Sequence, residues 1–66
     1  MNLAHKRKAV SLSQTELAQL LGVTRSTVAM WESGANVPPT VRLHKLSKVL
    51  NCTIDELLEE QEETAE

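Results

Sequence analysis

Residues 13–34 read Ser-Gln-Thr-Glu-Leu-Ala-Gln-Leu-Leu-Gly-Val-Thr-Arg-Ser-Thr-Val-Ala-Met-Trp-Glu-Ser-Gly, and this stretch decides the fold. Ser13 followed by Glu16 has the spacing of a capping box, which starts a helix. Apolar residues then repeat at helical spacing: Leu17, Ala18 and Leu21. Gly22 ends this helix, because glycine adopts the left-handed conformation of a C-terminal cap without strain.

A second short helix follows at once. Thr24 is expected to cap it, Val28 and Trp31 are expected to face inward, and Gly34 stops it. Two short amphipathic helices joined by a glycine turn are typical of a helix-turn-helix, whose second helix enters the major groove of DNA.

The flanking sequence predicts three more helices and no strand. Residues 2–10 carry Leu3, Arg7 and Val10 at helical spacing. After a loop that contains Pro38 and Pro39, a fourth helix is expected from a Thr40 cap. Its inward residues are expected to be Leu43, Leu46, Val49 and Leu50. Asn51 is a plausible left-handed end of that helix.

A second capping box, Thr53 with Glu56, starts the fifth helix, with Ile54, Leu57 and Leu58 as its apolar face. We therefore expect an all-α domain over residues 1–58. Residues 59–66 are expected to form an acidic tail that frays, because carboxylates at a helix C-terminus oppose the helix dipole.

The net charge of −2 hides two segments of opposite sign. Residues 1–54 hold all seven Lys and Arg residues and only two carboxylates, Glu16 and Glu32, whereas residues 55–66 hold the other seven Asp and Glu. A basic body makes binding to nucleic acid electrostatically plausible.

Other classes of protein find little support. No run of about 18 apolar residues predicts a membrane span, and no apolar segment follows the basic N-terminus to form a secretory signal. The lone Cys52 cannot pair within the chain, which suits a reducing cytoplasm. Because His5, His44 and Cys52 lie on separate segments, we expect no metal, no cofactor and no enzymatic activity.

The DNA-facing side chains follow from helix geometry. Opposite Val28 and Trp31 lie Arg25, Ser26, Ala29, Met30 and Ser33. Arg25 is suited to a bidentate contact with guanine, and Ser26 to a weaker contact with several bases. Met30 is either an apolar groove contact or a filler at the edge of the core.

Contacts to phosphate are expected from helix N-termini and nearby polar groups. Gln14 is the main candidate. Ser13 and Thr24 are expected to act first as helix caps and second as phosphate contacts, and Asn36, in the loop after the third helix, is a further candidate. Arg7 and Glu32 fit a different role, because both lie toward the inner side of their helices. We expect them to form a partly buried ion pair that joins the first and third helices.

The chain resembles the Cro/CI-type (XRE) helix-turn-helix family over residues 3–58. The motifs that carry the resemblance are Arg7, Leu-Ser-Gln-x-x-Leu-Ala at 12–18, Leu-Gly-Val-Thr at 21–24, Ser-Thr-Val at 26–28, Trp-Glu-x-Gly at 31–34, Pro38 and Ile-Asp-x-Leu at 54–57. Ser11 and the pair Asn51-Cys52 depart from the pattern, where members often have Gly and Gly-Val.

The resemblance implies a compact five-helix bundle of the lambda repressor-like type. It implies base contacts at Arg25, Ser26, Met30 and Thr27, phosphate contacts at Gln14 and Asn36, and an Arg7–Glu32 bridge. It also implies binding to DNA as a homodimer.

The leading hypothesis is a cytoplasmic, bacterial or phage-encoded repressor that occupies a pseudo-palindromic operator in double-stranded DNA. The helix Thr24–Ser33 would read the major groove, and the fifth helix would supply the dimer surface through Cys52, Ile54, Leu57 or Leu58. The alternative is a protein-interaction module, such as the antitoxin partner of a toxin, or a DNA-binding domain cut from a longer protein.

Overall fold

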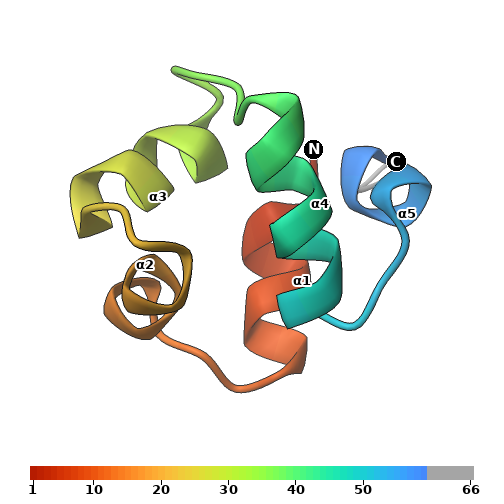
Figure 1. The fold of residues 1–66 in the computed structure, drawn as a ribbon, viewed down its shortest axis with the longest axis horizontal. Coiled ribbons are helices and arrows are strands. Elements are labelled where there is room, and N and C mark those ends of the chain that lie inside the picture. Colours follow the sequence, from red (N-terminus) through yellow and green to blue (C-terminus); the bar gives the residue numbers. More distant parts are fainter. Residues whose placement is uncertain (60–66) are drawn as a thin grey trace, which may run out of the picture.

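The computed structural model describes residues 1–59, and in that range the chain is helical without strands. The helices are α1 (Leu3–Ala9), α2 (Gln14–Leu21), α3 (Arg25–Ser33), α4 (Thr40–Val49) and α5 (Ile54–Leu58) (Figure 1). This confirms the predicted all-α fold with five helices. The predicted acidic tail, apart from Glu59, lies outside the described residues.

Side-chain caps begin three of the helices where the sequence predicts them. Ser13 Oγ accepts from the backbone N–H of Glu16 at 3.0 Å, and the Glu16 carboxylate accepts from the backbone N–H of Ser13 at 2.9 Å. Thr53 and Glu56 repeat this reciprocal box at the start of α5. Thr24 Oγ1 accepts from the N–H of Thr27 at 3.2 Å. These bonds satisfy N–H groups that a helix leaves unpaired in its first turn.

The prediction of a Thr40 cap is wrong. The N-cap of α4 is Pro39, and no side chain caps this helix. The backbone of Pro39 is extended, and its carbonyl accepts from the N–H groups of Arg42 at 2.9 Å and Leu43 at 3.0 Å. Because proline needs no hydrogen bond for its own nitrogen and has a fixed φ, it ends the loop one residue earlier than a threonine cap does.

Left-handed residues end two helices and shape two of the turns. Gly22 and Gly34 have φ values of 73° and 87°, and Ser11 and Asn51 have φ values of 62° and 56°. Ser11 therefore adopts, with a Cβ, the conformation that favours glycine. The expected left-handed Asn51 is confirmed.

One apolar core joins all five helices. Its buried members are Leu3, Leu17, Ala18, Leu21, Val28, Trp31, Leu46, Leu50 and Leu57. Leu43 and Val49 are only half-buried, but they pack against this cluster, as does Val10 just after α1.

Leu58 is an exception, because it was expected to face inward and is 45% exposed. Since α5 has only five residues, Leu57 takes the position that faces the core, and its neighbour points away.

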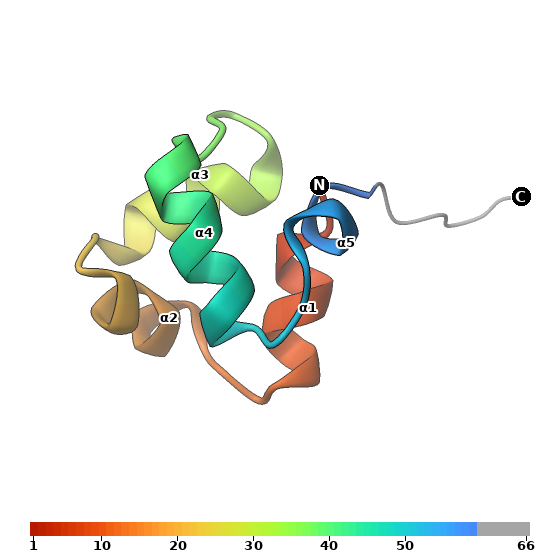
Figure 2. The same ribbon diagram turned by 45° about the vertical axis from the view of Figure 1, so that its right-hand side comes forward.

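The helices form two groups that share the core. Helices α2 and α3 lie together on one side, and α1, α4 and α5 pack beside them (Figure 1). The N-terminus lies against α5, where the N–H of Asn2 donates to the carbonyl of Leu57 at 3.1 Å (Figure 2). This frame leaves one side of α3 uncovered by the other helices.

Candidate nucleic-acid interface

The uncovered side of α3 carries three of the predicted base-contacting residues. Arg25, Ser26 and Met30 are exposed, whereas Val28 and Trp31 on the opposite side are 0% and 5% exposed. Within residues 1–59, no side-chain hydrogen bond or ion pair holds Arg25 or Ser26. Both side chains lie in the first turn of α3, and they are available to a ligand that approaches this end of the helix.

Thr27 differs from the other residues predicted to contact bases. It is half-buried, and its hydroxyl shares a hydrogen bond with the hydroxyl of Thr24 at 2.9 Å. Its backbone N–H donates to the same Thr24 oxygen. The two threonines thus form one capping unit, and the cap occupies the two hydroxyl groups from which contacts to DNA were expected.

Gln14, the main predicted phosphate contact, is the first residue of α2. Its side-chain Nε2 donates to Oε1 of Glu32 at 2.9 Å. Its backbone N–H belongs to the first turn of α2, where helices leave N–H groups open to an anion. The amide therefore ties α2 to the far end of α3, and the start of the helix faces outward beside the exposed Ser13.

The ion pair between Arg7 and Glu32 lies behind this surface. Nε of Arg7 donates to Oε2 of Glu32 at 2.6 Å, and Nη2 donates to Oε1 at 3.3 Å. The two side chains are 10% and 9% exposed. Nη1 of Arg7 also donates to the carbonyl of Leu12 at 2.7 Å. Together with Gln14, the Glu32 carboxylate joins α1, α2 and α3, so it sets how the two helices of the motif lie together.

The loop after α3 contacts the exposed surface of that helix. Asn36 donates twice to Met30: its backbone N–H to the Met30 carbonyl at 3.3 Å, and its side-chain Nδ2 to Sδ at 3.4 Å. The hydroxyl of Ser33 donates to the same carbonyl at 3.1 Å. Sequence reasoning placed Asn36 near the phosphate backbone and missed its contact with Met30, because no local pattern links a loop residue to a side chain six positions earlier.

A second missed contact involves Arg42. Its Nη1 donates to the carbonyl of Leu21 at 2.6 Å, at the C-terminal end of α2. A guanidinium there satisfies a free carbonyl and suits the negative end of the helix dipole. The 21 positions that separate the two residues leave no signal for this bond in the sequence.

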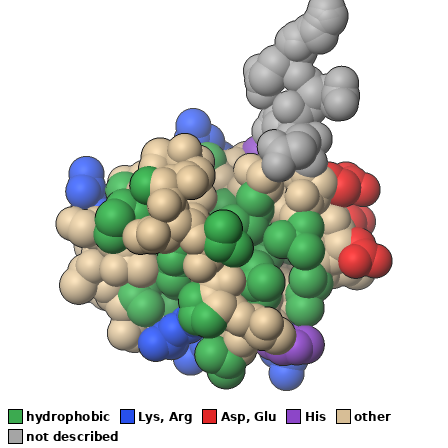
Figure 3. Space-filling model, turned by 90° about the horizontal axis from the view of Figure 1, so that it is seen from above, with side chains coloured by type: hydrophobic (Ala, Val, Ile, Leu, Met, Phe, Trp, Pro, Cys, Tyr) green, Lys and Arg blue, Asp and Glu red, His purple; other side chains and the backbone are tan. Residues whose placement is uncertain are grey.

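Charge is unevenly distributed over the described residues. The exposed cations are Lys8, Arg25, Lys45 and Lys48, with Lys6 half-buried. Three of the five carboxylates in this range, Asp55, Glu56 and Glu59, belong to α5 and the residue after it. Figure 3 shows acidic side chains gathered at the edge of the molecule where Figure 1 places α5. The acidic edge is thus separate from α3.

The described residues contain no group of three or more His, Cys, Asp and Glu side chains that could hold a metal ion. Burial raises the pKa of the Cys52 thiol above its usual value, which disfavours the reactive thiolate. No helix in this part of the chain has the length and apolar character needed to cross a membrane.

A capped pair of short helices, with the second exposed beside a rigid frame, defines the helix-turn-helix class of DNA-binding domain. A helix-turn-helix family model matches residues 3–57. The chain belongs to the Cro/CI-type (XRE) helix-turn-helix family.

Two curated relatives are transcription regulators. The chain is 40% identical over 60 residues to the HTH-type transcriptional activator BcrR of Enterococcus faecalis, covering 91% of this chain and 29% of BcrR. It is 34% identical over 55 residues to the cryptic phage CTXphi transcriptional repressor RstR of Vibrio cholerae, covering 83% of this chain and 49% of RstR. The chain thus spans half or less of the length of these relatives.

Solved structures give the same fold. The N-terminal DNA-binding domain of SinR from Bacillus subtilis superposes with a TM-score of 0.74 at 32% identity, covering 92% of this chain and 90% of that one. Hydroxypropylphosphonic acid epoxidase from S. wedmorenis superposes with a TM-score of 0.76 at 36% identity, but the match covers only 29% of the enzyme. The matching family model is a helix-turn-helix model, and both curated relatives are named as transcription regulators.

Proposed function

We propose that this chain is a sequence-specific binder of double-stranded DNA that acts in the cytoplasm as a transcriptional repressor. Helix α3, with its Thr24 cap, reads the major groove of an operator. The observation that carries the proposal is the first turn of α3, where Arg25 and Ser26 are exposed and no side chain of residues 1–59 binds them. An arginine at a helix N-terminus opposes the helix dipole, so this position is poor for stability and good for an anionic or guanine ligand.

Three kinds of contact follow for the surface around α3. Arg25 contacts guanine in a bidentate manner, and Ser26 and Met30 contact neighbouring base edges. Thr27 contributes less than these, because its hydroxyl is held by Thr24. Backbone N–H groups at the starts of α2 and α3, beside Ser13, Gln14 and Thr24, and the loop at Asn36 contact phosphates.

Selection of bound sequences from random double-stranded DNA tests this function. The wild-type chain should select a motif, and Arg25→Ala should relax the preference at one base pair in each half-site, at a cost of about 1–3 kcal/mol in discrimination. Lys45→Ala, which changes an exposed cation on α4, is the matched control and should leave the motif unchanged. A motif that survives Arg25→Ala removes this residue from base reading.

Salt dependence separates DNA binding from the alternative function as an interaction module. A DNA-binding domain loses affinity steeply as salt increases, in proportion to the phosphates that it neutralises. An absence of DNA affinity at every salt concentration rejects the proposal and favours a protein partner, such as a toxin.

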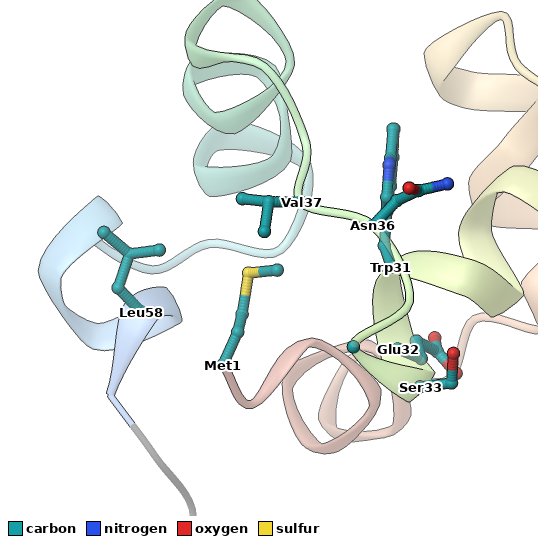
Figure 4. A pocket seen from close by; sticks show the side chains of 8 residues that line it. Met1, Trp31, Glu32, Ser33, Asn36, Val37 and Leu58 are labelled. Carbon is teal, nitrogen blue, oxygen red and sulfur yellow. The ribbon is translucent and has the colours of Figure 1, made fainter.

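We further propose that the chain binds its operator as a homodimer and that α5 supplies the contact through Leu58. Leu57 was also a candidate for the dimer surface, but it is 0% exposed, and Cys52 and Ile54 are only half-buried. Leu58 borders a hollow of about 450 Å³, in which its side chain lies near Val37 and Met1 (Figure 4). A second copy would cover these apolar groups.

Sedimentation with and without operator DNA tests the dimer. Leu58→Ser should weaken self-association on the operator, whereas Leu20→Ser, at another exposed leucine on α2, should not. A wild-type chain that stays monomeric both free and on an operator rejects the homodimer. A reporter gene placed behind the selected operator distinguishes repression from activation.

A further inference from the structure

The contact between Asn36 and Met30 joins two residues with different expected roles. Met30 lies on the exposed side of α3, and Asn36 lies in the loop that follows the helix. The backbone N–H of Asn36 reaches the Met30 carbonyl, and its side-chain amide reaches the Met30 sulfur at 3.4 Å. The first bond holds the loop to the backbone of Met30, and the second connects the Asn36 amide to the Met30 side chain.

The direction of the Asn36 side chain supports this connection. In Figure 4 its amide points away from Met1, Val37 and Leu58, which line the hollow beside α5. The loop around it is itself held, because the N–H of Ala35 donates to the hydroxyl of Ser33 at 3.3 Å and that hydroxyl donates to the Met30 carbonyl. The amide is thus supported from the backbone and directed at the sulfur.

Met30 needs such support more than its neighbours on α3 do. A methionine side chain has three rotatable bonds and adapts to many shapes, so alone it specifies a partner poorly. Met30 is 38% exposed, and packing restrains only part of it. A side chain held in one conformation before binding loses less freedom when it enters a groove.

We infer that Asn36 is a positioning residue for Met30, and that base preference at the position Met30 reads depends on Asn36. This inference rests on the proposed DNA-binding function and goes beyond it, because a residue expected only to contact phosphate then acts on sequence choice. Asn36 does so through the sulfur of Met30 and without touching the base.

The experiment compares sequence selection from random double-stranded DNA by wild type, Met30→Ala, Asn36→Ala and Gln14→Ala. Asn36→Ala should relax preference at the same base pair as Met30→Ala, by about fivefold, the lower end of what one mismatch costs. Gln14→Ala removes a proposed phosphate contact away from Met30, together with the bond from its amide to Glu32, and it should lower affinity for all sequences alike. In a Met30→Leu background, which lacks the sulfur acceptor, Asn36→Ala should not relax that base pair further.

A second readout needs no DNA. The chain has two methionines, Met1 and Met30. The methyl signal that disappears in Met30→Leu therefore belongs to Met30. In the free protein, Asn36→Ala should move the Met30 methyl carbon signal toward that of a freely rotating methionine, and Gln14→Ala should leave it in place. Asn36 is exposed, and Gln14→Ala removes one bond to Glu32 but leaves the Arg7–Glu32 pair in place, so thermal unfolding should show both variants folded.

The outcomes separate the two proposals. If wild type selects a motif and Asn36→Ala lowers affinity without changing base preference, Asn36 is only a phosphate contact and the inference is overturned. An unchanged Met30 methyl signal, or a motif unaffected by Met30→Ala, also overturns it. If wild type selects no sequence, the proposed function itself fails and the inference fails with it.

Discussion

Nε of Arg7 lies 2.6 Å from Oε2 of Glu32, and this ion pair joins α1 to α3 across 25 positions of sequence. Oε1 of the same carboxylate accepts from Gln14, so one acidic side chain holds three helices. Because both charged groups are about nine-tenths removed from water, the loss of either leaves the other unpaired in a poorly solvated place.

Arg7→Ala should therefore destabilise the domain strongly. A buried pair that loses one partner costs about 3–5 kcal/mol, which lowers the melting temperature of so small a domain by roughly 12 °C or more. Thermal unfolding followed by circular dichroism measures this change. Lys8→Ala, at the exposed neighbouring position, is the control and should unfold within a few degrees of wild type. Equal melting temperatures for Arg7→Ala and Lys8→Ala would contradict this account of the pair.

Ser11→Gly should stabilise the domain. Ser11 has a φ of 62°, a conformation that costs a residue with a Cβ about 1–2 kcal/mol. Glycine avoids that strain but adds freedom to the unfolded chain worth about 0.5–1 kcal/mol, so the net gain lies between about 0 and 1.5 kcal/mol and centres at about 0.75 kcal/mol. Asn51→Gly is the matched comparison, with a φ of 56°, and should gain less because asparagine tolerates this region. Urea unfolding of both variants measures the difference, and a larger gain at Asn51 would count against the strain at Ser11.

Arg42→Met should destabilise the domain while it keeps the packing of the apolar part of the side chain. Methionine keeps most of the apolar stem but loses the bond from Nη1 to the Leu21 carbonyl, at a cost of about 1.5 kcal/mol. Lys45→Met removes an exposed cation from the same helix and serves as the control. Denaturant unfolding gives the midpoints of the two variants. Equal midpoints would mean that the bond from Arg42 to the Leu21 carbonyl adds nothing to stability beyond the effect of a positive charge on α4.

The capping box at α5 should make part of the stability pH-dependent. The backbone N–H of Thr53 donates to the Glu56 carboxylate at 2.9 Å, and this bond lowers the pKa of Glu56 below its ordinary value. A carboxyl whose pKa is lower when folded contributes stability above its unfolded pKa and loses it as pH falls through the folded pKa. Melting temperatures of wild type and Glu56→Gln should therefore converge in acid. A gap that stays constant with pH would rule out the titration of Glu56 as its source.

Local chemistry accounts for most of the fold that the sequence predicts. Ser13, Thr24 and Thr53 act within one helical turn of themselves, so their spacing to the next polar residue is sufficient to predict a cap. The core positions follow from helical periodicity for the same reason. The prediction at Thr40 was wrong because threonine is a common N-cap residue, whereas the N-cap of α4 is the proline before it.

Contacts across the bundle were predicted only where charge made them specific. Arg7 and Glu32 could be paired from the sequence because two opposite charges on inner faces need each other. Arg42 with Leu21 and Asn36 with Met30 each involve a carbonyl or a sulfur, groups that any neighbour can satisfy, so only the three-dimensional arrangement identifies them. The burial of Leu58 could not be predicted for a similar reason, because a helix of five residues can place either Leu57 or Leu58 against the core.

The absence of partners for Arg25 and Ser26 among residues 1–59 has a consequence for how such a domain can change over time. Substitutions there leave the caps, the ion pair and the core intact, so under the proposed function new DNA preferences can arise without loss of folding. Position 30 is different, because a new side chain there must also suit residue 36. Under the proposed function, grafting another operator preference onto this scaffold should therefore treat 25 and 26 as independent choices and exchange 30 and 36 together.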